Sequence, residues 1–196
     1  SAKEVEGPWE RKELEGYYHD SSLLFDGDGR VYLVYGNREI KLVELKRDLS
    51  AVKEDGFKRT LAVDPDDAIL GYEGSHLYHI GNKYYLFMIH WPKYGANRRT
   101  EVCLMADSLE GEFTGGTVLD DDMGYFNQGV AQGGIVEATD GSWYAVLFRD
   151  SGAVGRVPVL VPVSWKDGFP VFGENGVIPR EFTTPDNRPG YRYEPL

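Results

Sequence analysis

The sequence has a single cysteine, Cys103, among its 196 residues, so no disulfide can form within the chain. Cys103 lies in the apolar run 101–105, which predicts a strand, and we expect it to be a buried structural thiol rather than a nucleophile. The sequence also lacks a Ser-His-Asp pattern, a phosphate-binding glycine loop and a paired-cysteine metal motif. These absences argue against the common nucleophilic, phosphate-binding and zinc chemistries.

Long apolar runs and positive charge are scarce as well. The sequence has no run of about 18 apolar residues and no signal-peptide pattern, so we expect a soluble protein and no membrane partner. Because the chain begins with Ser1, the missing signal leaves a secreted and a cytoplasmic location equally open. The formal net charge of −11 gives a surface that repels phosphates, so nucleic acid is not an expected partner, whereas neutral sugars are not repelled.

Short β-type runs separated by turn residues make up most of the chain, and no long amphipathic helix is evident. The segment 48–54 allows one helical turn at most. Asp26-Gly27 between two apolar runs is typical of a hairpin turn. A lone strand is predicted over 8–15. The other expected strands fall into three groups of four: 23–25, 30–35, 40–45 and 57–62; 73–80, 83–89, 100–106 and 112–119; 132–138, 143–148, 157–163 and 169–172.

These groups repeat in register. Asp20, Glu73 and Gln132 open the three groups, at intervals of 53 and 59 residues. A four-strand repeat of this length predicts the blades of a β-propeller, whereas a sandwich gives no such in-register repeat. Propellers usually close with about 4–8 blades. The fold class is therefore all-β, a propeller of which this chain supplies three four-stranded blades plus one strand. The remaining blades lie on another chain or have been lost, or the three blades close unusually.

The innermost strands of a propeller converge on its axis, which brings the first residues of each blade into one pocket. Asp20 and Glu73 occupy equivalent places in the repeat and form a candidate acid/base pair. The alternative is that each carboxylate caps a loop or accepts backbone hydrogen bonds. Their equivalence in the repeat favours the functional interpretation.

Several blocks together resemble glycoside hydrolase family 43, whose members are five-bladed propellers that cleave xylose- and arabinose-containing glycosides with inversion. The resemblance covers about residues 8–178 and is specific only as a set. The matching blocks are His19–Asp26 with Asp28–Leu33, Glu73–Tyr78 with Tyr84–Leu86, Gln132–Val136 with Asp140–Tyr144, Gly155–Arg156, Pro162–Trp165 and Asp167–Val171.

The resemblance implies roles for individual residues. Glu73 matches the general acid, which protonates the departing glycosidic oxygen. Asp20 matches the carboxylate that orients this acid and modulates its pKa, because a nearby negative charge raises the pKa of a carboxyl group. Arg156 matches an arginine that reaches the sugar in the terminal subsite of exo-acting members. A surface arginine at a turn is the alternative for Arg156.

Two departures from the family pattern matter. The general base, an aspartate on the inner strand of the first blade, has no counterpart before Gly7, so we expect this chain alone to be inactive. N-terminal blades on another chain or on a cleaved segment would supply that base. Where many members have a histidine near a central cation, often Ca²⁺, this chain has Gln132, which could bind a hydroxyl or a metal-held water. No cofactor is expected to be required, and a structural Ca²⁺ is less favoured than its absence. The acidic runs 64–67 and 120–122 are expected to be solvated loops.

Weaker candidates for substrate binding are His90 and Trp91, at the end of a second strand, and Phe126, just before an inner strand. His76 is expected to be structural. We expect the partial propeller to span 1–178, followed by a tail or the start of a linker over 179–196.

The predicted function is an inverting glycosidase that releases xylose or arabinose from oligosaccharides of the plant cell wall. A non-catalytic carbohydrate-binding propeller and a protein-interaction propeller are the alternatives. The sequence separates neither xylosides from arabinofuranosides nor exo from endo action.

Overall fold

The computed structural model describes residues 2–65 and 68–184, and it consists of three four-stranded antiparallel sheets. Each sheet takes its four strands in chain order. The strands are β1 (Ser22–Phe25), β2 (Val31–Tyr35), β3 (Glu39–Leu45) and β4 (Lys58–Val63); β5 (Ala68–Ile80), β6 (Lys83–Pro92), β7 (Thr100–Ala106) and β8 (Thr114–Leu119); β9 (Ala131–Glu137), β10 (Trp143–Asp150), β11 (Arg156–Lys166) and β12 (Phe169–Phe172). A short 3₁₀ helix, η1 (Gly152–Val154), precedes β11.

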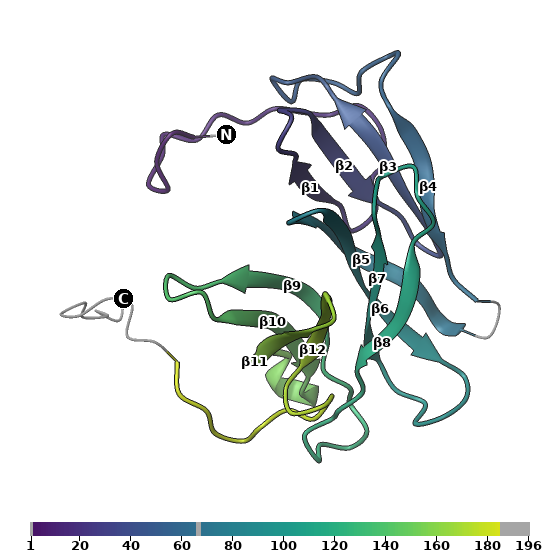
Figure 1. Ribbon diagram of the computed structural model, residues 1–196, viewed down its shortest axis with the longest axis vertical. Helices are drawn as coiled ribbons and strands as arrows, with labels where there is room; N and C mark the ends of the chain where they lie inside the picture. The colour runs from purple at the N-terminus through teal and green to yellow at the C-terminus, as the bar shows by residue number, and fades with distance from the viewer. Residues whose placement is uncertain (1, 66–67, 185–196) are drawn as a thin grey trace.

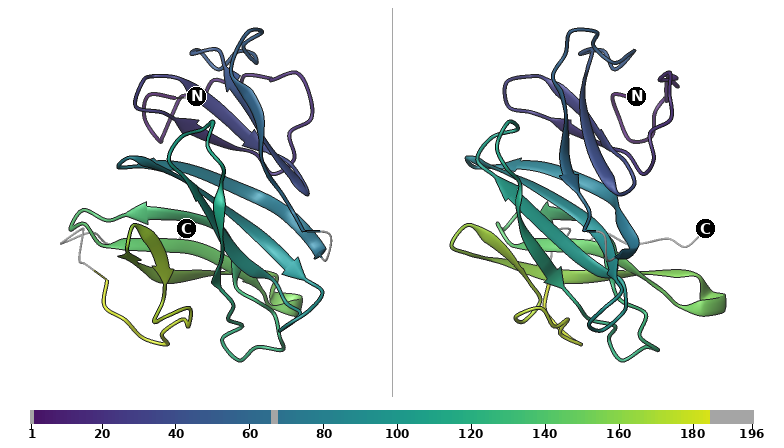
Figure 2. Two further views of the ribbon diagram at one scale, coloured as in Figure 1. Left: turned by 45° about the vertical axis from the view of Figure 1, so that its right-hand side comes forward. Right: turned by 90° about the vertical axis from the view of Figure 1, so that its right-hand side faces the viewer.

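The three sheets follow one another in an arc, as the blades of a propeller do (Figure 1). The first strands are neighbours, because β5 contacts both β1 and β9. The turned views in Figure 2 show the same succession of sheets, with β5–β8 between the other two. The predicted all-β propeller with three four-stranded blades is therefore confirmed.

Two apolar cores hold the blades together, one on each face of the middle sheet. Strand β6 shows this arrangement most clearly, because its side chains alternate between the two cores. Leu86 and Met88 pack toward the first sheet, whereas Tyr85 and Phe87 pack toward the third sheet. Complete burial of one such side chain contributes about 1.5–3 kcal/mol, so the middle blade is firmly fixed between its neighbours.

The sequence predicted all twelve blade strands, and it located β7 and β12 to the residue. β5 starts at Ala68, five residues before the expected start at Glu73. The expected strand over 8–15 is wrong, because these residues pair with no described strand and a strand needs a hydrogen-bonded neighbour. The segment 48–54 forms turns and no helix, and η1 was not foreseen.

Beyond β12 the described chain passes back over the third sheet. Ile178 is buried in the core between the second and third sheets, and Phe182 stacks on Tyr144 at a centroid distance of 6.1 Å. Residues 185–196, most of the predicted tail, lie outside the described residues, and the division between 178 and 179 stays a prediction. None of the helices among residues 2–65 and 68–184 has the length and apolar character that crossing a membrane requires.

Candidate active site

Irregular backbone at the inner strands sets the direction of the two candidate carboxylates. Glu73 lies in β5 between two register shifts in the β5–β6 pairing, and Gly74 follows it with φ +61°. A bulge of this kind bends a strand and redirects its side chains. Asp20 lies in a turn two residues before the start of β1 at Ser22 and has φ +44°, so it too leaves the regular pleat.

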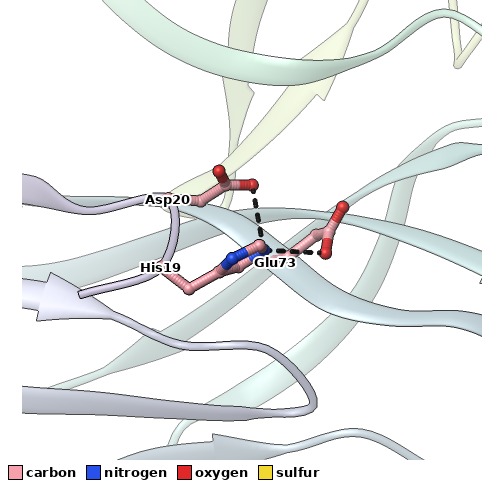
Figure 3. A group of neighbouring side chains, drawn as sticks. All are labelled: His19, Asp20 and Glu73. Atoms are coloured by element: carbon pink, nitrogen blue, oxygen red, sulfur yellow. Dashed lines mark hydrogen bonds and ion pairs between the residues drawn. The ribbon is translucent and has the colours of Figure 1, made fainter. Parts of the chain in front are cut away.

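His19 lies between the two carboxylates (Figure 3). Its Nε2 atom is 3.2 Å from Oε2 of Glu73 and 3.6 Å from Oδ2 of Asp20. The ring's other nitrogen, Nδ1, is 3.2 Å from the hydroxyl of Tyr17. The tautomer with its proton on Nε2 satisfies these contacts, since Nε2 then donates toward the carboxylates and Nδ1 accepts from Tyr17. The side chain of Glu73 is only 17% exposed, whereas those of His19 and Asp20 are about one-third exposed.

Asn37 adds a second donor to the acid. Its side-chain Nδ2 donates a hydrogen bond of 2.5 Å to Oε2 of Glu73, the same oxygen that faces His19. His19 and Asn37 therefore both contact Oε2 of Glu73.

Gln132 joins the group from the third blade. It lies at the start of β9, and its Nε2 donates a hydrogen bond of 3.3 Å to Oδ2 of Asp20. The three residues that the repeat singled out, Asp20, Glu73 and Gln132, therefore meet in space although they come from three blades. Their convergence is an observation, and their chemical roles stay predictions.

Two other predicted residues share a separate shallow hollow. Arg156, the first residue of β11, and Phe126 line a depression of about 410 Å³. Phe126 is 83% exposed, so its ring is available for stacking. Arg156 lies over the ring of Phe148 and is 3.5 Å from a carboxylate oxygen of Asp150. This hollow therefore combines an aromatic face, a cation and a carboxylate.

His90 and Trp91 end β6 but differ in accessibility. His90 is buried and packs edge to face against Tyr72, so it lies inside the blade rather than at the expected rim. Trp91 is partly buried beneath the guanidinium of Arg99, 5.4 Å from the ring centroid. Because Arg99 also pairs with Asp150, Trp91 is linked to the Phe126 hollow.

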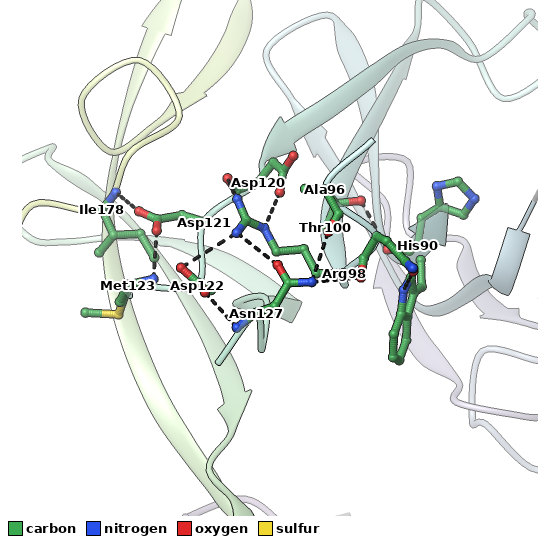
Figure 4. A network of polar contacts seen from close by, with 12 residues as sticks. His90, Ala96, Arg98, Thr100, Asp120, Asp121, Asp122, Met123, Asn127 and Ile178 are labelled. Carbon is green, nitrogen blue, oxygen red and sulfur yellow. Dashed lines mark hydrogen bonds and ion pairs between the residues drawn. The ribbon is translucent and has the colours of Figure 1, made fainter. Parts of the chain in front are cut away.

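The loop that carries Phe126 is fastened by a polar network (Figure 4). Arg98 donates to Asp120 through Nε at 2.5 Å and through Nη2 to its backbone carbonyl at 2.8 Å. Asn127 donates to the backbone carbonyls of Ala96 and Asn97. Consecutive residues Phe126 and Asn127 both have positive φ, so the network fixes a strained turn. Residues 120–122 form a loop, as expected, but only Asp120 is exposed, and Asp121 accepts the N–H of buried Ile178.

The carboxylate pair is also a candidate site for a cation. Ligand atoms of His19, Asp20 and Glu73 lie within 4.8 Å of one another. Ca²⁺ prefers a shell of oxygen ligands, whereas this group contains an imidazole. In addition, the amides of Asn37 and Gln132 direct N–H donors at the carboxylate oxygens. The residues present fit a hydrogen-bonded pair of carboxylates better than a Ca²⁺ site.

The sequence did not assign roles to His19 and Asn37. The sequence nevertheless contained a positional signal for both residues. His19 directly precedes Asp20. Asn37 follows the second strand of the first blade, much as His90 lies near the end of the second strand of the second blade. His76, expected to be structural, lies on β5, and burial lowers its pKa. Burial thus favours the neutral form of His76, which agrees with a structural role.

Comparisons with known proteins agree with this fold. The chain is 24% identical to the "Beta-xylosidase" of Formosa agariphila, over 88% of this chain and 34% of the relative. It is 27% identical to the "Xylosidase/arabinosidase" of Butyrivibrio fibrisolvens, over 87% of this chain and 37% of the relative. The chain thus spans about a third of the length of these relatives.

A solved structure, described as a bifunctional GH43-CE protein of Bacteroides eggerthii, superposes with a TM-score of 0.83. It shares 46% identity with this chain and covers 95% of it, and the match spans 24% of that protein. The sequence profile of glycosyl hydrolases family 43 matches residues 1–170, most of the 196-residue chain. The chain therefore belongs to glycosyl hydrolases family 43.

Proposed function

We propose that this chain supplies the general acid of an inverting glycosidase that releases xylose or arabinose from plant-cell-wall oligosaccharides. The observation that carries the proposal is the meeting of Glu73 and Asp20 on either side of His19. In this proposal Glu73 protonates the glycosidic oxygen as the bond to the sugar breaks. Asp20 orients the acid through His19, and the donors on Oε2 hold the proton on Oε1.

The general base comes from outside this chain in our proposal. An inverting enzyme needs a second carboxylate about 6.5–9.5 Å from the acid, so that a water molecule can attack the opposite face of the sugar. Asp20 is too close to Glu73 for this task, because ligand oxygens of the two carboxylates lie within 4.8 Å of each other. A further inner strand must therefore contribute an aspartate to the pocket.

Exposed apolar side chains on the first and third sheets support the proposal that further blades supply this aspartate. On the third sheet, Val136, Val146 and Leu160 share the face opposite the core and are 39–51% exposed. On the first sheet, Leu23 and Phe25 are exposed on the face opposite buried Leu24. The middle sheet, in contrast, is covered on both faces. We propose that N-terminal blades, on another chain or on a separate segment, cover these faces and close the ring.

The relatives and the hollow support the proposed substrate class. The names of the matched relatives include xylosidase and arabinosidase activities. We propose that the hollow formed by Phe126 and Arg156 binds a pentose near the end of the oligosaccharide, with the ring of Phe126 against an apolar sugar face and Arg156 donating to hydroxyls. Gln132 and Trp91 are proposed to contact substrate nearer the acid, whereas buried His90 supports that region from within the blade.

The decisive experiment compares the complete ring with its Glu73→Gln variant on aryl β-xyloside and aryl α-L-arabinofuranoside. General acid catalysis contributes about 10²–10⁴-fold, so hydrolysis should fall by that range while sugar binding, measured by calorimetry, persists. Proton NMR of the first-formed sugar should show the inverted anomer, and this chain alone should be inactive.

Full activity of Glu73→Gln would refute the role of Glu73. Sugar binding without hydrolysis in the complete unmodified ring would support the carbohydrate-binding alternative instead.

A further inference from the structure

A buried carboxyl group lies behind the candidate site, outside the acid pair. Glu101 is on β7 and has no solvent exposure. It shares a sheet face with Cys103, toward the third blade. Burial raises the pKa of Glu101 well above its usual value, because a charged carboxylate there would lose its hydration. Within residues 2–65 and 68–184, its Oε1 atom has no hydrogen-bond partner.

The other oxygen of Glu101 reaches the inner strand of the third blade. Oε2 accepts a hydrogen bond of 2.7 Å from the backbone N–H of Gln132. Three residues further along β9, the N–H of Ile135 donates to the hydroxyl of Tyr78 at 3.0 Å. Two side chains of the second blade therefore hold the backbone of β9 at the place where it enters the site.

The bond to Glu101 fixes a backbone conformation that Gln132 would otherwise avoid. Gln132 has φ +61°, in the left-handed region that side chains with a Cβ disfavour. This conformation sends the Gln132 side chain across the α-carbon of Gly74, where its amide reaches Asp20. A contact in the blade core thus sets the direction of a side chain in the candidate active site.

We propose that Glu101 is a positioning residue: its Oε2 holds the left-handed backbone of Gln132 and thereby keeps the Gln132 amide against Asp20. Its effect on hydrolysis rests on the proposed function of Asp20 and Glu73, whereas the positioning itself does not. Glu101 touches no substrate in this proposal. A merely space-filling role would be met equally well by an apolar side chain of similar size.

The test replaces Glu101 in two ways. Glu101→Gln keeps an acceptor oxygen for the Gln132 N–H, whereas Glu101→Met keeps the volume and removes the acceptor. Cys103→Ala is the matched control, because it alters the same buried face of β7 without touching Gln132. The readout in this chain is the side-chain amide resonance of Gln132 in a ¹H–¹⁵N spectrum, assigned by its loss in Gln132→Met.

Glu101→Met should move this resonance to the position of solvent-exposed glutamine amides, while Glu101→Gln and Cys103→Ala should leave it in place. In the complete ring, Glu101→Met should lower kcat about tenfold with KM within about twofold, since one hydrogen bond is displaced, and Glu101→Gln should restore kcat. Where Glu101→Met does not fold, Glu101→Asp replaces it, because the shorter acid withdraws its carboxyl group from Gln132.

An unmoved resonance in folded Glu101→Met or Glu101→Asp would overturn the proposal, as would an equal movement in Cys103→Ala. Absence of hydrolysis in the unmodified ring would refute the proposed function, and the amide resonance would then decide the positioning role by itself.

Discussion

The side chain of Gln132 lies directly over the α-carbon of Gly74, the residue that follows the candidate acid. A β-carbon at Gly74 would be 2.5 Å from Nε2 of Gln132 and 2.6 Å from its Cγ, closer than such atoms pack. Gly74 also has φ +61°, which glycine adopts readily. The second blade therefore needs a glycine beside Glu73 for the third blade's Gln132 to reach Asp20.

Gly74→Ala should displace Gln132 and lower activity of the complete ring without preventing folding. Gly81→Ala provides a matched control, because Gly81 has the same φ of +61° but no atom within 4 Å of its added methyl group. Backbone strain costs about 1–3 kcal/mol in both variants. The rate should fall only in Gly74→Ala, as measured by aryl glycoside hydrolysis, and equal rates in the two variants would contradict this role of Gln132.

Asp26 stabilises the contact between the first and second blades. Its carboxylate accepts hydrogen bonds from Tyr84 at 2.8 Å and from the N–H of Gly27 at 2.8 Å, and it is 2.5 Å from Nδ1 of His79. Burial alone would raise the pKa of Asp26, but these partners outweigh it and lower the pKa below its ordinary value. The stabilisation is therefore present above the unfolded-state pKa of about 3.9 and is lost as the pH falls through the folded-state value.

Asp26→Asn should lower the free energy of unfolding at pH 7 by about 1–3 kcal/mol, since a buried hydrogen-bond network loses an ionised acceptor. The difference from the unmodified protein should shrink below about pH 4 as Asp26 itself becomes protonated. Urea unfolding followed by tryptophan fluorescence measures both effects. Asp140→Asn, in the exposed turn of the third blade, is the control and should change stability little. A difference that is the same at pH 3 and pH 7 would contradict the role of Asp26.

Arg98 should contribute most to stabilising the loop that carries Phe126 (Figure 4). Its guanidinium bonds both the side chain and the backbone of Asp120, and it is 19% exposed. Arg98→Met should cost about 1.5–3 kcal/mol of stability and speed amide hydrogen exchange around Phe126. The control is Arg11→Met, because Arg11 pairs with Glu13 at an exposed position where such a pair contributes about 0–1 kcal/mol. Unchanged exchange in Arg98→Met would show that other contacts hold the loop.

The repeat made most of the fold predictable from the sequence. Each blade has its own turns and apolar runs, so local patterns located the strands, and the spacing from Asp20 to Glu73 and Gln132 predicted which side chains meet. The segment 8–15 has the same local pattern, but the strand predicted there is absent. Strand formation depends on a pairing partner that the local sequence does not specify. The structure then gave these residues no strand.

Beyond the convergence of the three residues that open the blades, the sequence did not predict which side chains make contact between blades. His19, Asn37 and Glu101 act on Glu73 or Gln132 from positions 31–54 residues away, and their geometry depends on how the blades pack. The role of Glu101 was especially hard to predict from the sequence, because its apolar neighbours predicted only a strand. A charged residue within an otherwise buried strand is a general signal for such contacts, since burial of an unpartnered carboxylate is costly.

Phe126 should contribute to sugar binding and almost nothing to stability. Phe126 is 83% exposed and lines the same hollow as Arg156, so Phe126→Ala removes little buried area. Stacking on a ring contributes about 0.5–1.5 kcal/mol, so we expect a KM increase of about two- to tenfold with kcat nearly unchanged. Tyr94→Ala is the control, because Tyr94 is 75% exposed but does not line this hollow. If both variants of the complete ring keep the KM of the unmodified enzyme, the pentose does not bind against Phe126, and the terminal subsite must be sought nearer Trp91.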